Sequence, residues 1–193
     1  MIKLGLLGNN ISKSEMPNLI TKLGNEFGFD VKYELFDQAS KTNFNFKKFL
    51  NQIKEKNIYG INVTYPFKEL ALEHSIKLSE ETKLVKSTNL ILINESMTSY
   101  NTDYSGFLNT YKFNFNKEPS KLVILGGGGV GKSVCFALIK LGVKELYIIE
   151  KDHIKLEKLI EDLKKQHEQV YSINLGELTE NQHEFDGFLN CSE

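Results

Sequence analysis

The stretch KLVILGGGGVGKSVCFALIKLGVKELYIIEKD, residues 121–152, decides the fold of the second half of the chain. An apolar run at residues 122–125 predicts a strand that leads directly into consecutive glycines. Val134, Leu138 and Leu141 then recur at helical spacing, and ELYIIE predicts a second strand. A strand, a glycine-rich turn, a helix and a strand in this order predict the βαβ unit of a Rossmann-type domain.

The glycine-rich turn is a candidate cofactor site. Glycines let the backbone approach a pyrophosphate, and N–H groups at the start of the helix then meet its charge. Glu150 ends the second strand, where a carboxylate accepts hydrogen bonds from ribose hydroxyls. One alternative is a purely structural glycine loop. A nucleoside-triphosphatase loop through Lys132 is a weaker alternative, because the spacing from glycine to lysine is too short. The candidate residues of the turn itself are Gly126, Gly127, Gly128, Gly129 and Val130.

The first half of the chain alternates between predicted strands and predicted helices. KLGLLG (3–8), VKYELF (31–36) and YGINVT (59–64) predict strands. This βαβαβ order predicts an open, mostly parallel sheet with helices on both faces. Two sets of apolar residues at helical steps predict the helices between the strands: Met16, Ile20, Leu23 and Phe27 in the first, and Phe46, Phe49, Leu50 and Ile53 in the second.

The middle of the chain contains shorter predicted elements and a domain boundary. KELALEHS (68–75) and SEETKLVK (79–86) predict helices, and TNLILIN (88–94) with TSYN (98–101) predicts a hairpin that turns at residues 94–96. DYSGFLNTYK (103–112) predicts a helix with Asp103 as its N-cap. FNFNKEPS then loses all periodicity. We therefore expect a substrate-binding catalytic domain at residues 1–112 and a dinucleotide-binding domain at residues 113–193.

Composition excludes several classes of function. Lys plus Arg number 24 and Asp plus Glu number 25, so a net charge of −1 gives no basic surface for nucleic acid or an anionic membrane. The chain has no run of apolar residues long enough to span a membrane and no signal-peptide pattern, so we expect a cytoplasmic protein. Cys135 and Cys191 are expected to be buried thiols, and the four histidines lack metal-ligand spacing.

GINVTYPFKE, residues 60–69, places a lysine just beyond the carboxyl end of a predicted central strand. Ligands of open α/β sheets bind at that edge, where Asn9 and Asn10 also follow the first strand. Lys68 and Asp103 are therefore candidates for the pair that exchanges a proton with an alcohol during hydride transfer. The alternative is a surface lysine and an aspartate that only caps a helix.

The motifs, taken in order, resemble one family. GNNISKSEMPN (8–18), GINVTYPFKE, STNLILI (87–93), NTDYSGF (101–107) and GGGGVGK (126–132) are similar to motifs of the shikimate and quinate dehydrogenases. The resemblance runs from Lys3 to about Ser192. It implies an open α/β substrate domain followed by a Rossmann-type NAD(P)-binding domain. The implied reaction interconverts shikimate and 3-dehydroshikimate in the chorismate pathway of aromatic amino acid biosynthesis, or acts on quinate.

The resemblance also implies roles for individual residues. Lys68 is similar to the catalytic lysine that exchanges a proton with the C3 oxygen, and Asp103 to the aspartate that binds the substrate hydroxyl and holds the ammonium. Thr64 and Asn89 resemble substrate hydroxyl contacts. Glu80 falls where some members of the family place an acidic residue near the cofactor.

The N-terminal loop departs from the family pattern. Members offer two hydroxyls, one residue apart and directly before a proline, to the substrate carboxylate. Counted without gaps, these positions are Ser14 and Met16, and a methionine cannot donate that hydrogen bond. In a shortened loop Ser12 and Ser14 would supply the hydroxyls, but the proline would then be displaced.

The end of the chain and the cofactor segment depart from the pattern as well. FDGFLNCSE (185–193) is similar to a family strand after which members continue, so the dinucleotide-binding domain is expected to be incomplete. An active dehydrogenase and a non-catalytic homologue that binds a small polyol acid or a nucleotide are both compatible with this ending. No other partner than a small molecule is expected, and the chain is expected to be a monomer or a homodimer.

The residues that follow the second strand of the Rossmann-type unit bear on the choice between NAD and NADP. Members of the family usually use NADP and bind its 2′-phosphate with a polar or basic segment at this position. This chain has Glu150, Lys151 and Asp152 there, and two carboxylates repel a phosphate while Lys151 attracts it. The local residues therefore favour NAD, and the family habit favours NADP. Asp152 also fits the N-cap of the following helix.

Overall fold

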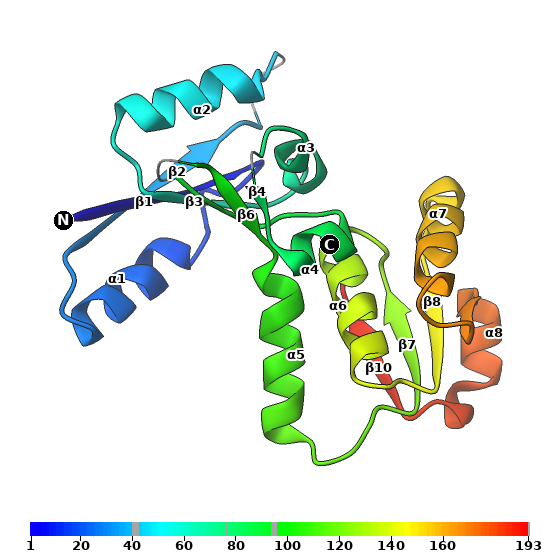
Figure 1. Ribbon diagram of the computed structural model, residues 1–193. Helices are drawn as coiled ribbons and strands as arrows, with labels where there is room; N and C mark the ends of the chain where they lie inside the picture. Colours follow the sequence, from blue (N-terminus) through cyan, green and yellow to red (C-terminus); the bar gives the residue numbers. More distant parts are fainter. Residues whose placement is uncertain (40–42, 76, 94–95, 193) are drawn as a thin grey trace. The chain divides into compact units, whose positions relative to one another are not determined.

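The computed structural model describes residues 1–39, 43–75, 77–93 and 96–192. The chain forms two compact units, Met1–Thr102 and Asp103–Glu193. Each unit has a sheet of its own, and helices pack on it (Figure 1). This confirms an α/β fold with an N-terminal open-sheet domain and a C-terminal Rossmann-type domain.

The first unit is built on a six-stranded sheet in the order β2-β1-β3-β5-β6-β4. β1 is parallel to β2 and β3, whereas β5 is antiparallel to both β3 and β6. The parallel half of the sheet therefore carries the edge at which a ligand is expected. The strands are β1 (Ile2–Gly8), β2 (Val31–Asp37), β3 (Gly60–Val63), β4 (Lys77–Leu78), β5 (Leu90–Leu92) and β6 (Thr98–Tyr100).

The helices of this unit cover both faces of the sheet. α2 (Phe46–Glu55) begins at Asn45, whose side chain accepts a hydrogen bond from the Lys48 N–H at 2.9 Å. Its apolar residues pack against the face that carries Phe36, and the rings of Phe36 and Phe49 lie 5.3 Å apart. α1 (Met16–Glu26) lies on the opposite face of the sheet, below it in Figure 1. The first core contains the four residues that predicted α2, Phe46, Phe49, Leu50 and Ile53.

Three further helices follow along the chain, two in the first unit and one that begins at its last residue. They are α3 (Lys68–Glu73), α4 (Glu80–Val85) and α5 (Thr102–Asn114). The predicted helices at 68–75 and 79–86 and the two hairpin strands are confirmed, but the hairpin's turn includes residues 94–95, which lie outside the described part of the chain. Asp103 was predicted to cap α5, and that prediction is wrong: the helix begins one residue earlier, and Asp103 lies in its first turn.

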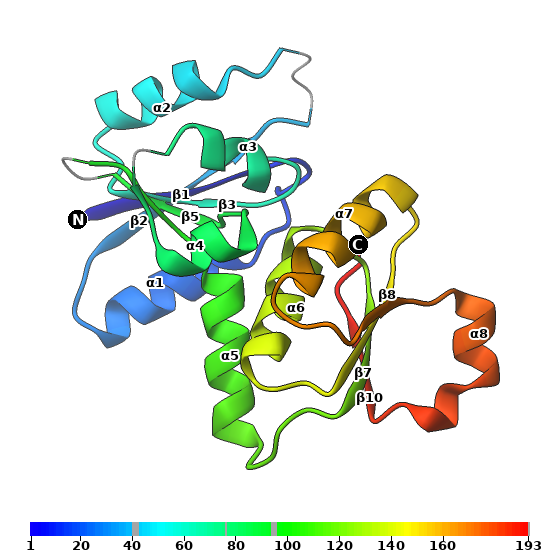
Figure 2. The ribbon, with the colours of Figure 1, turned by 45° about the vertical axis from the view of Figure 1, so that its right-hand side comes forward.

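The second unit has a four-stranded sheet in the order β10-β7-β8-β9, and every pairing is parallel. α6 (Gly129–Lys140) and α7 (His153–Lys164) connect its strands and lie side by side (Figure 2). The predicted domain boundary after residue 112 falls inside α5 and stays a prediction. The remaining elements are β7 (Lys121–Leu125), β8 (Glu145–Ile149), β9 (Val170–Ser172), α8 (Leu175–Glu180), the 3₁₀ turn Gln182–Glu184 and β10 (Gly187–Asn190).

Candidate active site

The carboxyl ends of β1 and β3 bring Gly8 and Thr64 together. The Thr64 N–H donates to the Leu7 carbonyl at 2.9 Å, and the Asn9 N–H donates to the Tyr65 carbonyl at 3.0 Å. A Cβ atom on Gly8 would lie 2.3 Å from the Thr64 methyl carbon, so glycine is required there. Thr64 is therefore held at the carboxyl edge of the parallel strands, where ligands of open α/β sheets bind, and its contact with a substrate hydroxyl stays a prediction.

Lys68 is the first residue of α3 and is half-buried. Its carbonyl accepts a hydrogen bond from the Thr88 N–H at 3.1 Å, and the Asn89 carbonyl accepts one from the Val63 N–H at 2.8 Å. These two bonds attach the segment before β5 to the end of β3 and the start of α3. Thr64, Lys68 and Asn89, which are far apart in the sequence, thus belong to one corner of the first unit.

Asn89 is buried, and its side chain binds the start of α5. Its Nδ2 donates to Thr102 Oγ1 at 2.8 Å, and its Oδ1 accepts from the Thr102 N–H at 2.8 Å. Sequence reasoning predicted Asn89 as a substrate contact and did not single out Thr102. The only sequence signal for Thr102 was its place in the NTD motif, directly before Asp103. Asn89 and Thr102 together anchor the backbone from which the Asp103 side chain extends, while the pairing of Asp103 with Lys68 stays a prediction.

The loop after β1 is held by Asp37 at the end of β2. The Asp37 carboxylate accepts hydrogen bonds from the Asn10 N–H at 3.0 Å and from the Ile11 N–H at 2.9 Å. Backbone hydrogen bonds, that from Ala39 the largest, lower the pKa of this carboxyl. The sequence analysis did not identify this residue, because no sequence pattern connects Asp37 with a loop that lies about 27 residues before it in the chain.

The same loop contains the candidate carboxylate-binding residues. Ser12 is exposed, and Ser14 is half-buried. Ser14 Oγ accepts a hydrogen bond from the Met16 N–H at 3.3 Å, at the start of α1. Both alternatives, Ser14 with Met16 and Ser12 with Ser14, therefore stay predictions. Asn9 Oδ1 is a buried oxygen without a hydrogen-bond partner in the described part of the chain, and it lies at this polar edge.

The glycine turn of the second unit has glycines of two kinds. Gly126 has a φ of +96°, and a Cβ atom on Gly131 would lie 1.9 Å from the Gly126 carbonyl oxygen, so the fold itself requires both. A Cβ atom on Gly128 would meet no atom within 4 Å. Gly128 is also the N-cap of α6 and gives that helix no side-chain cap. The open space beside uncapped N–H groups at the helix start fits the pyrophosphate of a dinucleotide.

Glu150 binds the glycine turn through its carboxylate. One oxygen accepts from the Gly127 N–H at 2.7 Å, and the other accepts from the Asp152 N–H at 3.0 Å. Burial alone would raise the pKa of Glu150, but these backbone hydrogen bonds outweigh it, and the pKa lies below its ordinary value. Asp152 caps α7 by accepting from the Lys155 N–H at 3.1 Å, as predicted. The contact of Glu150 with a ribose stays a prediction.

Three further candidates lie on the surface. Val130 and Lys151 are exposed, in the first turn of α6 and directly after Glu150. Glu80 lies in the first turn of α4, and its carboxylate is 2.6 Å from the Lys83 ammonium. Its predicted place near the cofactor stays a prediction.

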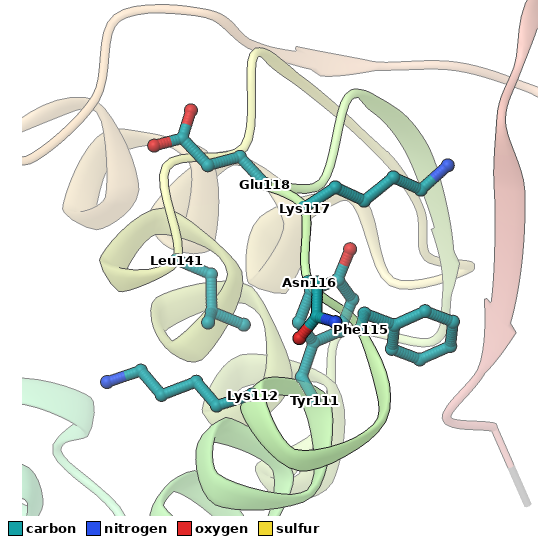
Figure 3. A pocket seen from close by; sticks show the side chains of 7 residues that line it. All are labelled: Tyr111, Lys112, Phe115, Asn116, Lys117, Glu118 and Leu141. Atoms are coloured by element: carbon teal, nitrogen blue, oxygen red, sulfur yellow. The ribbon is translucent and has the colours of Figure 1, made fainter.

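A hollow of about 240 Å³ lies elsewhere in the second unit (Figure 3). It is bounded by the end of α5, the segment that leads into β7, and the residue after α6. The glycine turn follows the opposite, carboxyl end of β7. The hollow is thus not part of the candidate cofactor site. Its lining residues are Tyr111, Lys112, Phe115, Asn116, Lys117, Glu118 and Leu141.

Comparison with known proteins agrees with this geometry. Residues 6–91 match the model of the shikimate dehydrogenase substrate binding domain. A shikimate dehydrogenase (NADP(+)) of Caldicellulosiruptor bescii is 30% identical over 167 residues. The chain is a homologue of the shikimate dehydrogenases. The alignment covers 83% of this chain and 56% of the C. bescii enzyme, so the chain spans little more than half the length of that relative.

Solved structures of a quinate dehydrogenase and a shikimate dehydrogenase have the same fold as this chain over nearly all of its length. Quinate dehydrogenase from Corynebacterium glutamicum in complex with NAD matches with a TM-score of 0.87 at 26% identity, over 99% of this chain and 70% of that one. Shikimate 5-dehydrogenase from Thermus thermophilus in complex with NADP(H) and shikimate matches with a TM-score of 0.81 at 25% identity, over 100% and 69%. Both nicotinamide cofactors therefore occur among proteins similar to this one.

Two other kinds of feature are absent from the described residues. No group of three or more His, Cys, Asp or Glu side chains in them is arranged to hold a metal ion. No helix in the described ranges combines the length and the apolar character that a membrane span needs.

Proposed function

We propose that this chain carries the catalytic domain and the cofactor turn of an NAD(P)-dependent dehydrogenase that interconverts shikimate and 3-dehydroshikimate, with quinate as the alternative substrate. The observation that carries the proposal is the corner formed by Thr64, Lys68 and Asn89 at the carboxyl edge of a parallel sheet. The match of residues 6–91 to a shikimate dehydrogenase substrate binding domain supports the same substrate class.

In this proposal the first unit binds the polyol acid and handles its proton. Thr64 and Asn89 bind substrate hydroxyls, and the loop held by Asp37 binds the carboxylate. Lys68 takes the hydroxyl proton when the alcohol carbon loses hydride, and returns it in the reverse direction. Asp103 binds the same hydroxyl and orients the Lys68 ammonium.

The glycine turn of the second unit holds the pyrophosphate, and the nicotinamide, when bound, supplies the hydride acceptor. Gly128 leaves the space, and the N–H groups of α6 meet the charge. We also propose that NAD is preferred to NADP. Glu150 lies at the turn as a carboxylate with a lowered pKa, so it stays charged and repels a 2′-phosphate.

The function is tested by steady-state kinetics on the 193-residue chain with shikimate or quinate and with NAD or NADP. We expect turnover with shikimate, and a fall of kcat by about 10²-fold or more in Lys68→Ala with little change of KM, because the proton transfer is lost. Lys54→Ala, an exposed lysine in the last turn of α2, is the matched control and keeps wild-type kcat.

Two results would contradict the proposal. Unchanged kcat in Lys68→Ala would remove Lys68 from the reaction. Shikimate binding by calorimetry without any turnover would favour the non-catalytic homologue that binds a small polyol acid.

A further inference from the structure

The hollow at the end of α5 has an apolar wall made by two side chains (Figure 3). Tyr111 lies in the last turn of α5 and is half-buried, and Leu141 is the C-cap residue of α6. The rings of Phe107 and Phe115, one helical turn before and after it, lie 6.2 and 4.7 Å from the Tyr111 ring. These ring contacts hold the Tyr111 side chain in place, so the wall exists before any ligand binds.

Two opposite charges flank this wall. The side chains of Lys112 and Glu118 extend to the same side as Leu141, the left side in Figure 3. Both residues are exposed, and neither forms an ion pair in the described part of the chain. A gap therefore separates the ammonium from the carboxylate, and both can meet charged groups of a ligand.

The turn that ends α6 places Glu118 beside the wall. Gly142 has a φ of +82°, a conformation that favours glycine. A Cβ atom on Gly142 would lie 3.3 Å from the carboxyl carbon of Glu118. The Glu118 carboxylate thus lies against the backbone of the residue that directly follows Leu141.

The second lysine of the lining, Lys117, belongs to different surroundings. Its side chain extends to the right in Figure 3, away from Leu141 and Glu118. The pKa of Asp186 is lowered first by the hydrogen bond from the Lys121 N–H, and the Lys117 charge contributes to the same shift. Lys117 therefore serves Asp186, and Lys112 is the lysine that faces the ligand side of the hollow.

The ligand that matches these groups is a small zwitterion with an apolar body. A carboxylate would meet the Lys112 ammonium, an ammonium would meet the Glu118 carboxylate, and a ring would pack on Tyr111 and Leu141. The volume of about 240 Å³ is smaller than that of pockets for drug-sized ligands, which begin at about 300 Å³. A phosphate ester is disfavoured, because Glu118 would repel it.

We propose that the hollow binds a free α-amino acid with an aromatic side chain, whose carboxylate faces Lys112 and whose ammonium faces Glu118. This site lies in the second unit and uses none of the residues assigned to substrate or cofactor. It is therefore independent of the reaction proposed above.

Calorimetric titration of the 193-residue chain with L-phenylalanine and three relatives tests the proposal. We expect a Kd of about 1 mM or lower for L-phenylalanine. Exposed charge pairs contribute little, so the ring supplies most of the affinity, and L-alanine is expected to bind at least about tenfold more weakly. Phenylalanine amide lacks the carboxylate and N-acetylphenylalanine lacks the ammonium, and each is expected to bind about three- to fivefold more weakly.

Variants of the two charged residues identify which group each one contacts. Lys112→Gln is expected to weaken L-phenylalanine binding by about three- to fivefold and to leave binding of the amide unchanged. Glu118→Gln is expected to weaken L-phenylalanine binding equally and to leave binding of the N-acetyl compound unchanged. Lys117→Gln is the matched control from the same hollow and is expected to keep the wild-type Kd. A purely structural effect of a variant would weaken all ligands alike.

Three results would overturn the proposal. The first is the absence of L-phenylalanine binding to the wild-type chain up to about 10 mM. The second is binding of L-alanine as tight as that of L-phenylalanine. The third is a loss of affinity in Lys112→Gln or Glu118→Gln that is equal for every ligand, or no larger than the loss in Lys117→Gln.

Discussion

Glu150 is the residue whose charge bears most directly on cofactor choice. Its carboxylate lies against the glycine turn, held by the N–H groups of Gly127 and Asp152. At an effective dielectric constant near 20, two unit charges about 4 Å apart interact with about 4 kcal/mol before screening. Lys151 follows in the chain and is exposed, so solvent and salt weaken its opposing attraction.

We expect the wild-type chain to bind NAD more tightly than NADP, and Glu150→Gln to shift the ratio of the two affinities towards NADP by about tenfold. Asp152→Asn is the matched control, because asparagine keeps the cap of α7 and removes a charge that is farther from the turn. Calorimetric titration and kcat/KM with both cofactors measure the ratio. A wild-type preference of tenfold or more for NADP would show that Lys151 outweighs both carboxylates.

At the level of single residues, the sequence predicts where a residue lies relative to the ends of strands and helices. It does not predict which distant residues its side chain contacts. The position of Glu150 at the end of a strand was predictable, as was the capping role of Asp152, because both depend on neighbouring residues. The bonds of Asp37 to the loop after β1, and of Asn89 to Thr102, join segments that only the folded sheet brings together. Thr102 and Asp37 were consequently missed.

At the scale of elements, the turn between β7 and α6 contains glycines that the fold requires and one, Gly128, that only the proposed cofactor site requires. Gly131→Ala places a methyl group against the Gly126 carbonyl and is expected to lower the free energy of unfolding by more than about 2 kcal/mol. Gly128→Ala meets no atom and is expected to change it by about 1 kcal/mol or less. The same variant is expected to weaken NADH binding by about tenfold or more, because its methyl group occupies the pyrophosphate space.

Urea denaturation and NADH fluorescence titration measure these two effects separately. Gly106→Ala in α5, where a Cβ atom also meets nothing, is the matched control for NADH binding and is expected to leave it unchanged. It is expected to raise the free energy of unfolding by about 0.5–1 kcal/mol, because alanine favours a helix more than glycine does. Unaltered NADH binding in Gly128→Ala would contradict the assignment of the turn to the cofactor.

Long elements with one apolar face were predictable, and short or edge-dependent ones were not. α2 follows from the spacing of Phe46, Phe49, Leu50 and Ile53, all of which are buried. β4 contains only Lys77 and Leu78, too few residues to show an alternating pattern, and it exists because it pairs with β6. The start of α5 was misplaced because its first N–H is satisfied by Asn89, a residue outside the local sequence.

At the scale of the whole molecule, each unit contains an aspartate whose carboxylate accepts hydrogen bonds from backbone N–H groups of another segment. Asp37 holds the loop after β1, and Asp186 accepts from the Lys121 N–H at 2.9 Å at the start of β7. Hydrogen bonds hold the pKa of both carboxyls below its ordinary value. The largest contribution comes from the Ala39 N–H for Asp37 and from the Lys121 N–H for Asp186. A carboxyl whose pKa is lower in the folded state stabilises the fold fully above its unfolded pKa, and this contribution is lost as the pH falls through the folded pKa.

We therefore expect the urea midpoint of the wild-type chain to fall as the pH drops through and below the ordinary aspartate range. Asp37→Asn and Asp186→Asn should each make this fall smaller, and the double variant should reduce it by the sum of the two effects, because the residues lie in separate units. Midpoints at neutral and acidic pH measure the change. A double variant with the full wild-type pH dependence would contradict the assignment.

The two-domain plan could be predicted from the sequence because each half repeats the alternation of strands and helices. The order of strands in the first sheet could not, since the sequence shows neither that β5 runs antiparallel to β3 nor that β2 lies at an edge. The exposure of Leu19, Leu23 and Phe27 on α1 could not be predicted for the same reason. Periodicity identifies an apolar helix face but does not say what covers it.

All six strands of the first sheet lie within Met1–Thr102, before any strand of the second sheet. During synthesis from the N-terminus, a contiguous unit of this kind leaves the ribosome before the glycine turn, which follows it in the chain, emerges. The first unit can complete its sheet without waiting for the second. The order of translation thus favours a first unit that is already folded when the glycine turn emerges.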